Sequence, residues 1–305
     1  QPLSDLIRGH ARAQPEALAL RDLHTVLSYA ALNERVDRVA AALQRDGVKS
    51  GQCVAICALS SVDYACVFLG ALRAGVVVAP LAPSSTPQIL TGMLRDAQAS
   101  LLFVDEAARA LVEPEMQTLP RIALDASAAG RSLENWLTAP GSAPAAVQVT
   151  PEAAFNIIYS SGTTGTPKGI VQSHGMRWTH MRRGLAYGYS PATRSLLSTP
   201  LYSNTTLVVF FPTLALGGCV LIMPKFKAAE YLALAEQHRI THTMLVPVQY
   251  QRIMDCPDFD QRDLSSFEAK LCTSETFAAP LKAEGDRGCP GALTGVYGMP
   301  EGGAT

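Results

Sequence analysis

The chain reads Tyr159-Ser160-Ser161-Gly162-Thr163-Thr164-Gly165-Thr166-Pro167-Lys168-Gly169 from residue 159 to residue 169. Three glycines stand among five serine and threonine hydroxyls, and one lysine comes near the end. Glycine tolerates positive φ and lets an anion approach the main chain. Backbone N–H groups can then surround phosphate oxygens, while hydroxyls and the lysine add donors and positive charge. Residues 155–159 and 170–171 read as flanking strands. We therefore predict a phosphate-binding loop carried by a sheet.

Two other interpretations of this stretch are weaker. A Walker loop ends in Gly-Lys-Ser or Gly-Lys-Thr, whereas here Pro167 precedes Lys168 and Gly169 follows it. Kinases and GTPases built on that loop are therefore excluded. An ordinary surface turn is the second alternative, because glycine, serine, threonine and proline also mark turns. The strand before the loop and the lysine at its end favour phosphate binding.

Composition excludes several classes of protein. The chain has 305 residues, of which 48% are hydrophobic and 17% charged, so it can bury a large core in one or two domains. A net charge of −1 gives no reason to expect nucleic acid or an anionic membrane as a partner. No run approaches the ~18 apolar residues of a membrane span. The seven cysteines form no CxxC pair, which favours reduced thiols in a cytoplasmic protein. The start at Gln1 shows no signal peptide, and we expect it to be trimmed.

The order of apolar and amphipathic segments predicts the fold class. Apolar runs at 54–58, 76–79 and 101–104 have the length and composition of buried strands. Between them, residues 28–46, 61–74 and 86–96 carry apolar side chains at helical spacing. Strands that alternate with helices indicate an α/β fold with mostly parallel sheets flanked by helices. Residues 138–151 read as an exposed connection.

The loop resembles the phosphate loop of the ANL superfamily of adenylate-forming enzymes. That superfamily comprises acyl-CoA and aryl-CoA synthetases, the adenylation domains of peptide synthetases, and firefly luciferase. A second family signature, Tyr-Gly-x-Thr-Glu, is present in altered form as Tyr297-Gly298-Met299-Pro300-Glu301. Further similarity begins at Leu27-Ser28-Tyr29, so the resemblance covers nearly the whole chain.

The resemblance implies a domain organisation. Residues 1–305 would form the AMP-binding N-terminal domain, with two packed α/β subdomains. One would span about residues 50–190 and carry the phosphate loop, and the other would combine 1–49 with 191–305 on the acyl and adenine side. Complete relatives continue into a mobile C-terminal lid, which we expect to be missing here, so that the isolated chain is incomplete for activity.

The resemblance also implies an activity and its cofactors. Such enzymes are AMP-forming acid–thiol ligases, which convert a carboxylic acid and ATP into an acyl-adenylate and then pass the acyl group to coenzyme A. The implied catalytic residues are Lys168 and Glu301, of which Glu301 would bind Mg²⁺. The implied ATP-binding residues are Ser160, Ser161, Gly162, Thr163, Thr164, Gly165, Lys168, Ser274, Glu275, Thr276, Tyr297, Gly298 and Met299. The sequence leaves a homodimer open.

The implied substrate pocket follows residues 196–201. Its predicted residues are Tyr202, Ser203, Asn204, Leu207 and Gly298. Relatives that activate amino acids place an aspartate here, because a buried ammonium group needs a counter-charge. No Asp or Glu occurs between Thr199 and Lys225. We therefore expect an uncharged fatty or aryl acid as substrate, as in fatty acid metabolism.

Departures from the family pattern keep two alternatives open. Pro300 replaces the family threonine and offers neither a hydroxyl nor an N–H near the α-phosphate. Glycines that usually contact adenine are absent from residues 273–277. A non-catalytic nucleotide-binding relative is one alternative, and an amino-acid adenylation domain of a carrier-protein assembly line is the other.

Of the histidines, we predict that His174 begins a helix and that the His238–His242 pair is structural or exposed rather than metal-binding.

Overall fold

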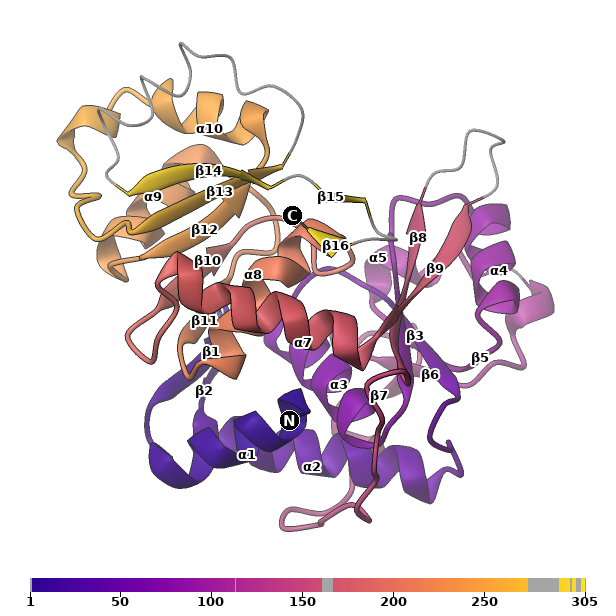
Figure 1. Cartoon of the computed structure of the whole chain (residues 1–305). Helices are drawn as coiled ribbons and strands as arrows, with labels where there is room; N and C mark the ends of the chain where they lie inside the picture. Colours follow the sequence, from indigo (N-terminus) through magenta and orange to yellow (C-terminus); the bar gives the residue numbers. More distant parts are fainter. Residues whose placement is uncertain are drawn as a thin grey trace. The chain divides into compact units, whose positions relative to one another are not determined.

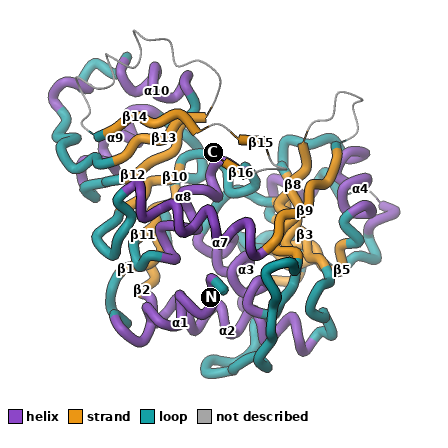
Figure 2. The backbone as a smooth tube through the Cα atoms, in the orientation of Figure 1, coloured by secondary structure: helices purple, strands orange, loops and turns teal. Residues whose placement is uncertain are grey.

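The computed structural model describes residues 2–112, 114–160, 167–273, 291–296, 298–299 and 303–304. The chain divides into two compact units (Figure 1). The first unit comprises Gln1–Pro15 and Ala30–Trp178, and the second comprises Glu16–Tyr29 and Thr179–Thr305. Each unit is built on one mostly parallel seven-stranded sheet, which confirms the predicted α/β class (Figure 2).

The sheet of the first unit has the strand order β7-β6-β5-β3-β4-β8-β9. Only the edge pair β8–β9 is antiparallel. Its strands are β3 (Cys53–Cys57), β4 (Val77–Leu81), β5 (Ala99–Val104), β6 (Arg121–Ala123), β7 (Arg131–Ser132), β8 (Ala154–Ser160) and β9 (Lys168–Ser173). Its helices are α1 (Leu3–Ala13), α2 (Tyr29–Arg45), α3 (Val62–Arg73), α4 (Pro87–Asp96), α5 (Glu106–Arg109) and α6 (Leu133–Trp136), with a 3₁₀ turn at Pro114–Met116.

Helices cover both faces of this sheet. Leu90, Met93 and Leu94 of α4 join the odd-numbered residues of β3 and β4 in one buried cluster. On the other face, Phe68 of α3 packs against Phe155 of β8 with ring centroids 6.4 Å apart. Because both faces of β3 and β4 are buried, these strands read in the sequence as continuous apolar runs.

The sheet of the second unit has the strand order β14-β13-β12-β10-β11-β1-β2, again with one antiparallel edge pair, β1–β2. Its strands are β1 (Leu18–Arg21), β2 (Val26–Ser28), β10 (Arg194–Leu197), β11 (Cys219–Ile222), β12 (His242–Leu245), β13 (Ala269–Thr273) and β14 (Ala292–Val296). The remaining elements of this unit are α8 (Asn204–Ala215), α9 (Ala228–Gln237), α10 (Pro247–Met254), 3₁₀ turns at Gly184–Tyr187 and Phe259–Gln261, and the small pair β15 (Gly298–Met299) and β16 (Gly303–Ala304). Helix α7 (His174–Arg183) begins in the first unit and continues into the second, because the boundary follows Trp178.

Helices also lie on both faces of the second sheet. The Ser195 hydroxyl of β10 lies 2.7 Å from that of Thr213, which places α8 on one face. The next residue of β10, Leu196, joins Leu232 of α9 and Ile253 of α10 in a buried cluster on the opposite face. Because β1 and β10 to β14 pair in parallel, their carboxyl ends lie at one edge of the sheet, where such sheets bind ligands.

The unit boundaries differ from the predicted subdomain boundaries. Only residues 16–29 of the predicted 1–49 segment belong to the second unit, because β1 pairs with β11. Helix α2 belongs to the first unit, where Arg35 forms an ion pair of 2.7 Å with Asp63 of α3. Gly70 of α3 also packs so closely on Val39 that a β-carbon there would overlap the valine side chain. These contacts link residues about thirty positions apart, which periodicity does not reveal.

Candidate active site

The predicted phosphate loop lies between the two strands of the β8–β9 hairpin. Tyr159 pairs with Gly169 across the hairpin, and Ser160 pairs with Lys168. Ser160 is half-buried, whereas Lys168 is exposed, and its side chain has no hydrogen-bond or ion-pair partner among the described residues. The structure thus places these two predicted site residues opposite one another. The other five predicted loop residues lie outside the described residues, namely Ser161, Gly162, Thr163, Thr164 and Gly165.

One face of the hairpin is fixed to α4. The Tyr159 hydroxyl donates to Asp96 Oδ2 over 2.6 Å and lies 3.2 Å from the Met93 carbonyl oxygen. Burial raises the pKa of Tyr159, and the hydrogen bond to Asp96 raises it further. The phenol therefore keeps its proton and remains a donor at neutral pH.

The other face of the hairpin is fixed to α7 by a buried guanidinium. Arg177 donates from Nε to Asn156 Oδ1 over 3.1 Å and from a terminal nitrogen to Gln172 Oε1. Asn156 and Gln172 are cross-strand partners, so one arginine holds both strands of the hairpin. Arg177 is fully buried, and burial lowers its pKa to about 9. Its role was not predicted, since a basic residue on a helix gives no sign in the sequence that it faces inward.

His174 occupies the start of α7, as predicted. Its N–H donates to the Ala153 carbonyl over 2.9 Å, and its ring packs edge-on against Phe155 with centroids 4.9 Å apart. Burial lowers the pKa of His174. The residue therefore begins a helix and packs against β8.

Four of the five predicted substrate residues lie where β10 leads into α8, and the fifth, Gly298, lies in β15. Tyr202, Ser203 and Asn204 are partly exposed, and Ser203 stands at the N-terminal end of the helix. Leu207 lies one turn further and is fully buried. The surroundings contain hydroxyls, since Thr199 and Thr206 are hydrogen-bonded over 2.7 Å. In the described residues of this segment, polar groups at the helix start therefore border an apolar helix interior.

The predicted adenine and metal residues follow the carboxyl ends of β13 and β14 in the sequence. Ser274, Glu275, Thr276, Tyr297 and Glu301 lie outside the described residues. Gly298 and Met299 form β15, which pairs antiparallel with β16. Within the described part of the chain, no group of three or more His, Cys, Asp or Glu residues could hold a metal ion.

The second histidine of the His238–His242 pair is part of the core. His242 of β12 is fully buried, and its Nε2 lies 2.7 Å from the Tyr187 carbonyl oxygen. Its Nδ1 lies 2.8 Å from the Thr241 hydroxyl, and Tyr189 packs against the ring at 4.2 Å between centroids. Both ring nitrogens are thus used within the protein.

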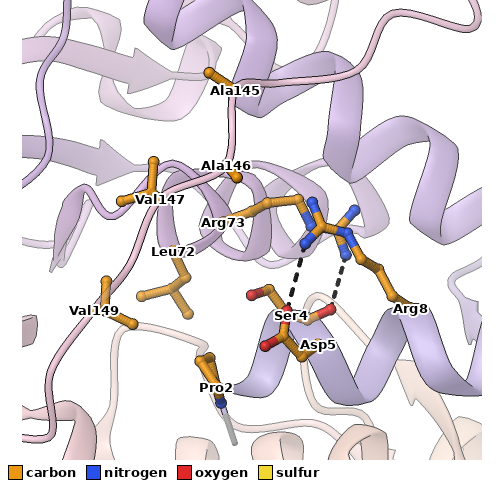
Figure 3. Close-up of a pocket in the computed structure, with 10 residues that line it drawn as sticks. All are labelled: Pro2, Ser4, Asp5, Arg8, Leu72, Arg73, Ala145, Ala146, Val147 and Val149. Atoms are coloured by element: carbon orange, nitrogen blue, oxygen red, sulfur yellow. Dashed lines mark hydrogen bonds and ion pairs between the residues drawn. The ribbon is translucent and has the colours of Figure 1, made fainter.

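A cavity of about 130 Å³ lies elsewhere in the first unit (Figure 3). It is lined by Pro2, Ser4, Asp5, Arg8, Leu72, Arg73, Ala145, Ala146, Val147 and Val149. Arg73 already donates to the Ser4 carbonyl over 3.1 Å and to Asp37 over 2.9 Å. None of the lining residues is a predicted site residue, so this cavity is separate from the predicted pocket.

Two further features bear on the class of protein. Of the helices formed by the described residues, none is long and apolar enough to cross a membrane. The six cysteines in the same part of the chain are free thiols: Cys53, Cys57, Cys66, Cys219, Cys256 and Cys272.

Comparisons with known proteins identify the family. The family model described as "AMP-binding enzyme" matches residues 7–305. Indoleacetate–CoA ligase of Aromatoleum aromaticum is 32% identical over 98% of this chain and 60% of its own length. Tyrocidine synthase 3 of Brevibacillus parabrevis is 31% identical over 85% of this chain, which corresponds to 4% of that protein. This chain therefore spans less than two thirds of the curated relatives that it matches.

The fold has close counterparts among solved structures. The inhibitor-bound N-terminal domain of FACL13 from Mycobacterium tuberculosis superposes with a TM-score of 0.89, at 21% identity, over 98% of this chain and 76% of that domain. The family match and this shared fold agree with the resemblance of the phosphate loop to adenylate-forming enzymes. The chain belongs to the family of AMP-binding enzymes.

Proposed function

We propose that this chain is the ATP-binding part of an AMP-forming acid–thiol ligase. The observation that carries the proposal is the β8–β9 hairpin, in which Ser160 and Lys168 form a cross-strand pair at the two ends of the phosphate loop. Lys168 is exposed and has no partner among the described residues, so its charge is available to a polyphosphate. Family membership and the similarity to indoleacetate–CoA ligase support the same activity.

The proposed reaction has two steps. A carboxylate oxygen attacks the α-phosphorus of ATP, the bond from that phosphorus to the bridging oxygen breaks, and pyrophosphate leaves. The sulfur of coenzyme A then attacks the acyl carbon of the acyl-adenylate, the carbon–oxygen bond to AMP breaks, and the thiol proton is released. In the first step the protein positions the phosphates and neutralises their charge. Ser160 and Lys168 are the described residues that we assign to this task.

The place of Mg²⁺ in the proposal rests on the resemblance. Glu301 is the residue that we propose as its ligand, because a carboxylate suits a hard cation. Glu301 lies outside the described residues.

We propose an uncharged fatty or aryl acid as the substrate. No acidic residue occurs between Thr199 and Lys225, so nothing in this segment could balance the ammonium group of an amino acid. Tyr202 offers aromatic surface at the start of α8. Each substrate methylene buried there would contribute about 0.8 kcal/mol to binding.

An assembly-line adenylation domain is the second candidate. It is favoured by the match to tyrocidine synthase 3, a far longer protein of which the matched stretch makes up only 4%. In that case the acyl acceptor would be a carrier-bound thiol instead of free coenzyme A. The absence of acidic residues at the β10–α8 connection opposes an amino-acid substrate.

A panel of acids tests the proposed substrate class. Acid-dependent exchange of labelled pyrophosphate into ATP is measured on the full-length protein, with fatty, aryl and free amino acids, followed by thioester formation with coenzyme A. We expect exchange with fatty or aryl acids that rises with tail length until the pocket is full. Preference for a free amino acid would replace the proposal by the assembly-line alternative, and exchange with no acid at all would contradict both.

A further inference from the structure

The two faces of the β8–β9 hairpin have different partners close to the phosphate loop. Successive residues of a strand point to opposite faces. The cross-strand pair Tyr159–Gly169 therefore points to one face, and the next pair, Ser160–Lys168, points to the other. The first pair faces α4, as the contact of Tyr159 with Asp96 shows. Lys168 and its partner thus stand on the opposite face, one residue from that contact.

The contact between Tyr159 and Asp96 is short. The phenol oxygen lies 2.6 Å from Asp96 Oδ2, within the range of charge-assisted O–H···O⁻ hydrogen bonds. Asp96 is the last residue of α4, which runs alongside β8 and β9 (Figure 1). Because Tyr159 immediately precedes Ser160, this bond attaches the loop end of β8 to the helix.

Gly169 brings the second strand to the same point. A β-carbon on Gly169 would lie 3.0 Å from Asp96 Oδ2 and 3.0 Å from Tyr159 Cε1. The carboxylate and the aromatic ring therefore lie directly against the glycine, and a larger residue there would require both side chains to shift by a few tenths of an ångström. Helix α4, strand β8 and strand β9 thus meet at one place, next to Ser160 and next to Lys168.

We propose that Asp96 and Tyr159 are a positioning pair, which locks the stem of the phosphate loop onto α4 and thereby fixes Ser160 and Lys168 for the polyphosphate. The role in catalysis rests on the proposed function. Neither member of the pair acts on ATP directly, because both lie on the face of the hairpin away from Lys168. Arg177 holds the base of the hairpin from the other face, through Asn156 and Gln172, whereas the α4 contact lies beside the loop.

The matched variants remove one hydroxyl each from the full-length protein. Tyr159→Phe deletes the bond to Asp96 and keeps the ring that packs on Gly169. Tyr250→Phe is the control, because the Tyr250 hydroxyl donates over 2.8 Å to the Leu271 carbonyl in the second unit. Asp96→Asn and the double variant complete a thermodynamic cycle for the pair.

Two readouts separate positioning from general stability. The first is amide hydrogen exchange at residues 158–160 and 168–170, which does not depend on any activity. The second is the kcat and KM for ATP in acid-dependent pyrophosphate release. We expect Tyr159→Phe to speed exchange at these residues and to lower kcat/KM for ATP about tenfold, since small misplacements of binding groups reduce rates strongly. Tyr250→Phe should change neither these exchange rates nor kcat/KM for ATP, although it should lower Tm about as much as Tyr159→Phe does.

The cycle adds a stricter requirement. The double variant should be no worse than Tyr159→Phe alone, because Tyr159→Phe already removes the bond that Asp96→Asn, whose amide oxygen still accepts, only weakens. Wild-type exchange rates at residues 158–160 and 168–170 in Tyr159→Phe would overturn the positioning pair. So would a loss of kcat/KM no larger than that of Tyr250→Phe. A wild-type protein that shows slow exchange at these residues but neither binds ATP nor releases pyrophosphate would instead contradict the proposed function.

Discussion

At the scale of single residues, the closest packing against a glycine in the described part of the chain is at Gly70. This residue of α3 lies against the side chain of Val39 in α2. A β-carbon added to Gly70 would also lie 3.2 Å from the Val36 carbonyl oxygen. The two helices approach closely there because Gly70 has no side chain and the Val39 side chain packs directly on its backbone. This contact explains why α2 belongs to the first unit, contrary to the predicted boundary at residue 50.

Gly70→Ala should therefore destabilise the protein. The added methyl group would overlap Val39, and forcing extra volume into a packed core costs about 1–3 kcal/mol. Gly92→Ala in α4 is the matched control, since nothing lies within 4 Å of its added β-carbon. Alanine is the better helix former, so the control should gain about 0.5–1 kcal/mol. Urea unfolding of both variants checks the opposite signs, and equal stability of the two would refute the packing argument.

At the scale of elements, the hairpin that carries the phosphate loop depends on α7. Arg177→Met would remove the donor shared by Asn156 and Gln172, and each lost hydrogen bond from a charged group is worth about 1.5–3 kcal/mol. Methionine carries no charge, so the variant avoids the cost of burying the Arg177 guanidinium, which offsets part of this loss. We expect a net loss of about 2 kcal/mol.

The control for Arg177 lies on the same helix. Arg182 is exposed, so Arg182→Met should change the free energy of unfolding by less than about 0.5 kcal/mol. Chemical unfolding of both variants measures the difference. A loss of stability in Arg182→Met as large as in Arg177→Met would show that the buried contacts with the hairpin are not responsible.

The elements that the sequence predicts well are those whose signals are local. Thr86 and Pro87 indicate a helix start, and Thr86 indeed accepts from the Ile89 N–H at the beginning of α4. The apolar run at 54–58 is β3, displaced by one residue. Burial of Arg177 and the pairing of β1 with β11 were not predicted, because both depend on contacts between distant parts of the chain. The roles of Glu301 and Tyr297 stay predictions, since these residues lie outside the described structure.

At the scale of the whole molecule, one buried and two partly buried histidines make stability depend on pH. Burial lowers the pKa of His242 below its ordinary value of 6.5, although the Tyr187 carbonyl and Glu268 oppose the shift. Burial also lowers the pKa of His174 and His238. The unfolded chain therefore binds protons more readily than the folded protein. Stability from this source is fully present above about pH 6.5 and is lost as the pH falls through the folded-state values.

A histidine variant tests this pH dependence. His242→Gln should be less stable than wild type at about pH 8, because the hydrogen bonds to Tyr187 and Thr241 are disturbed. Its free energy of unfolding should fall less steeply between about pH 7 and pH 5. The exposed His24 provides the control, and His24→Gln should keep the wild-type slope. An unchanged slope in His242→Gln would rule out this residue as the source.

The proposed function depends most on Lys168 as a ligand of ATP phosphates. Its most direct test is calorimetric titration of the full-length protein with Mg-ATP, comparing wild type, Lys168→Ala and Lys49→Ala. Lys49 is likewise an exposed lysine of the first unit and serves as the control. We predict that Lys168→Ala weakens binding at least tenfold, about 1.4 kcal/mol, whereas Lys49→Ala binds as wild type does. Equal affinity of Lys168→Ala and wild type would contradict the assignment of the β8–β9 hairpin as the phosphate-binding site.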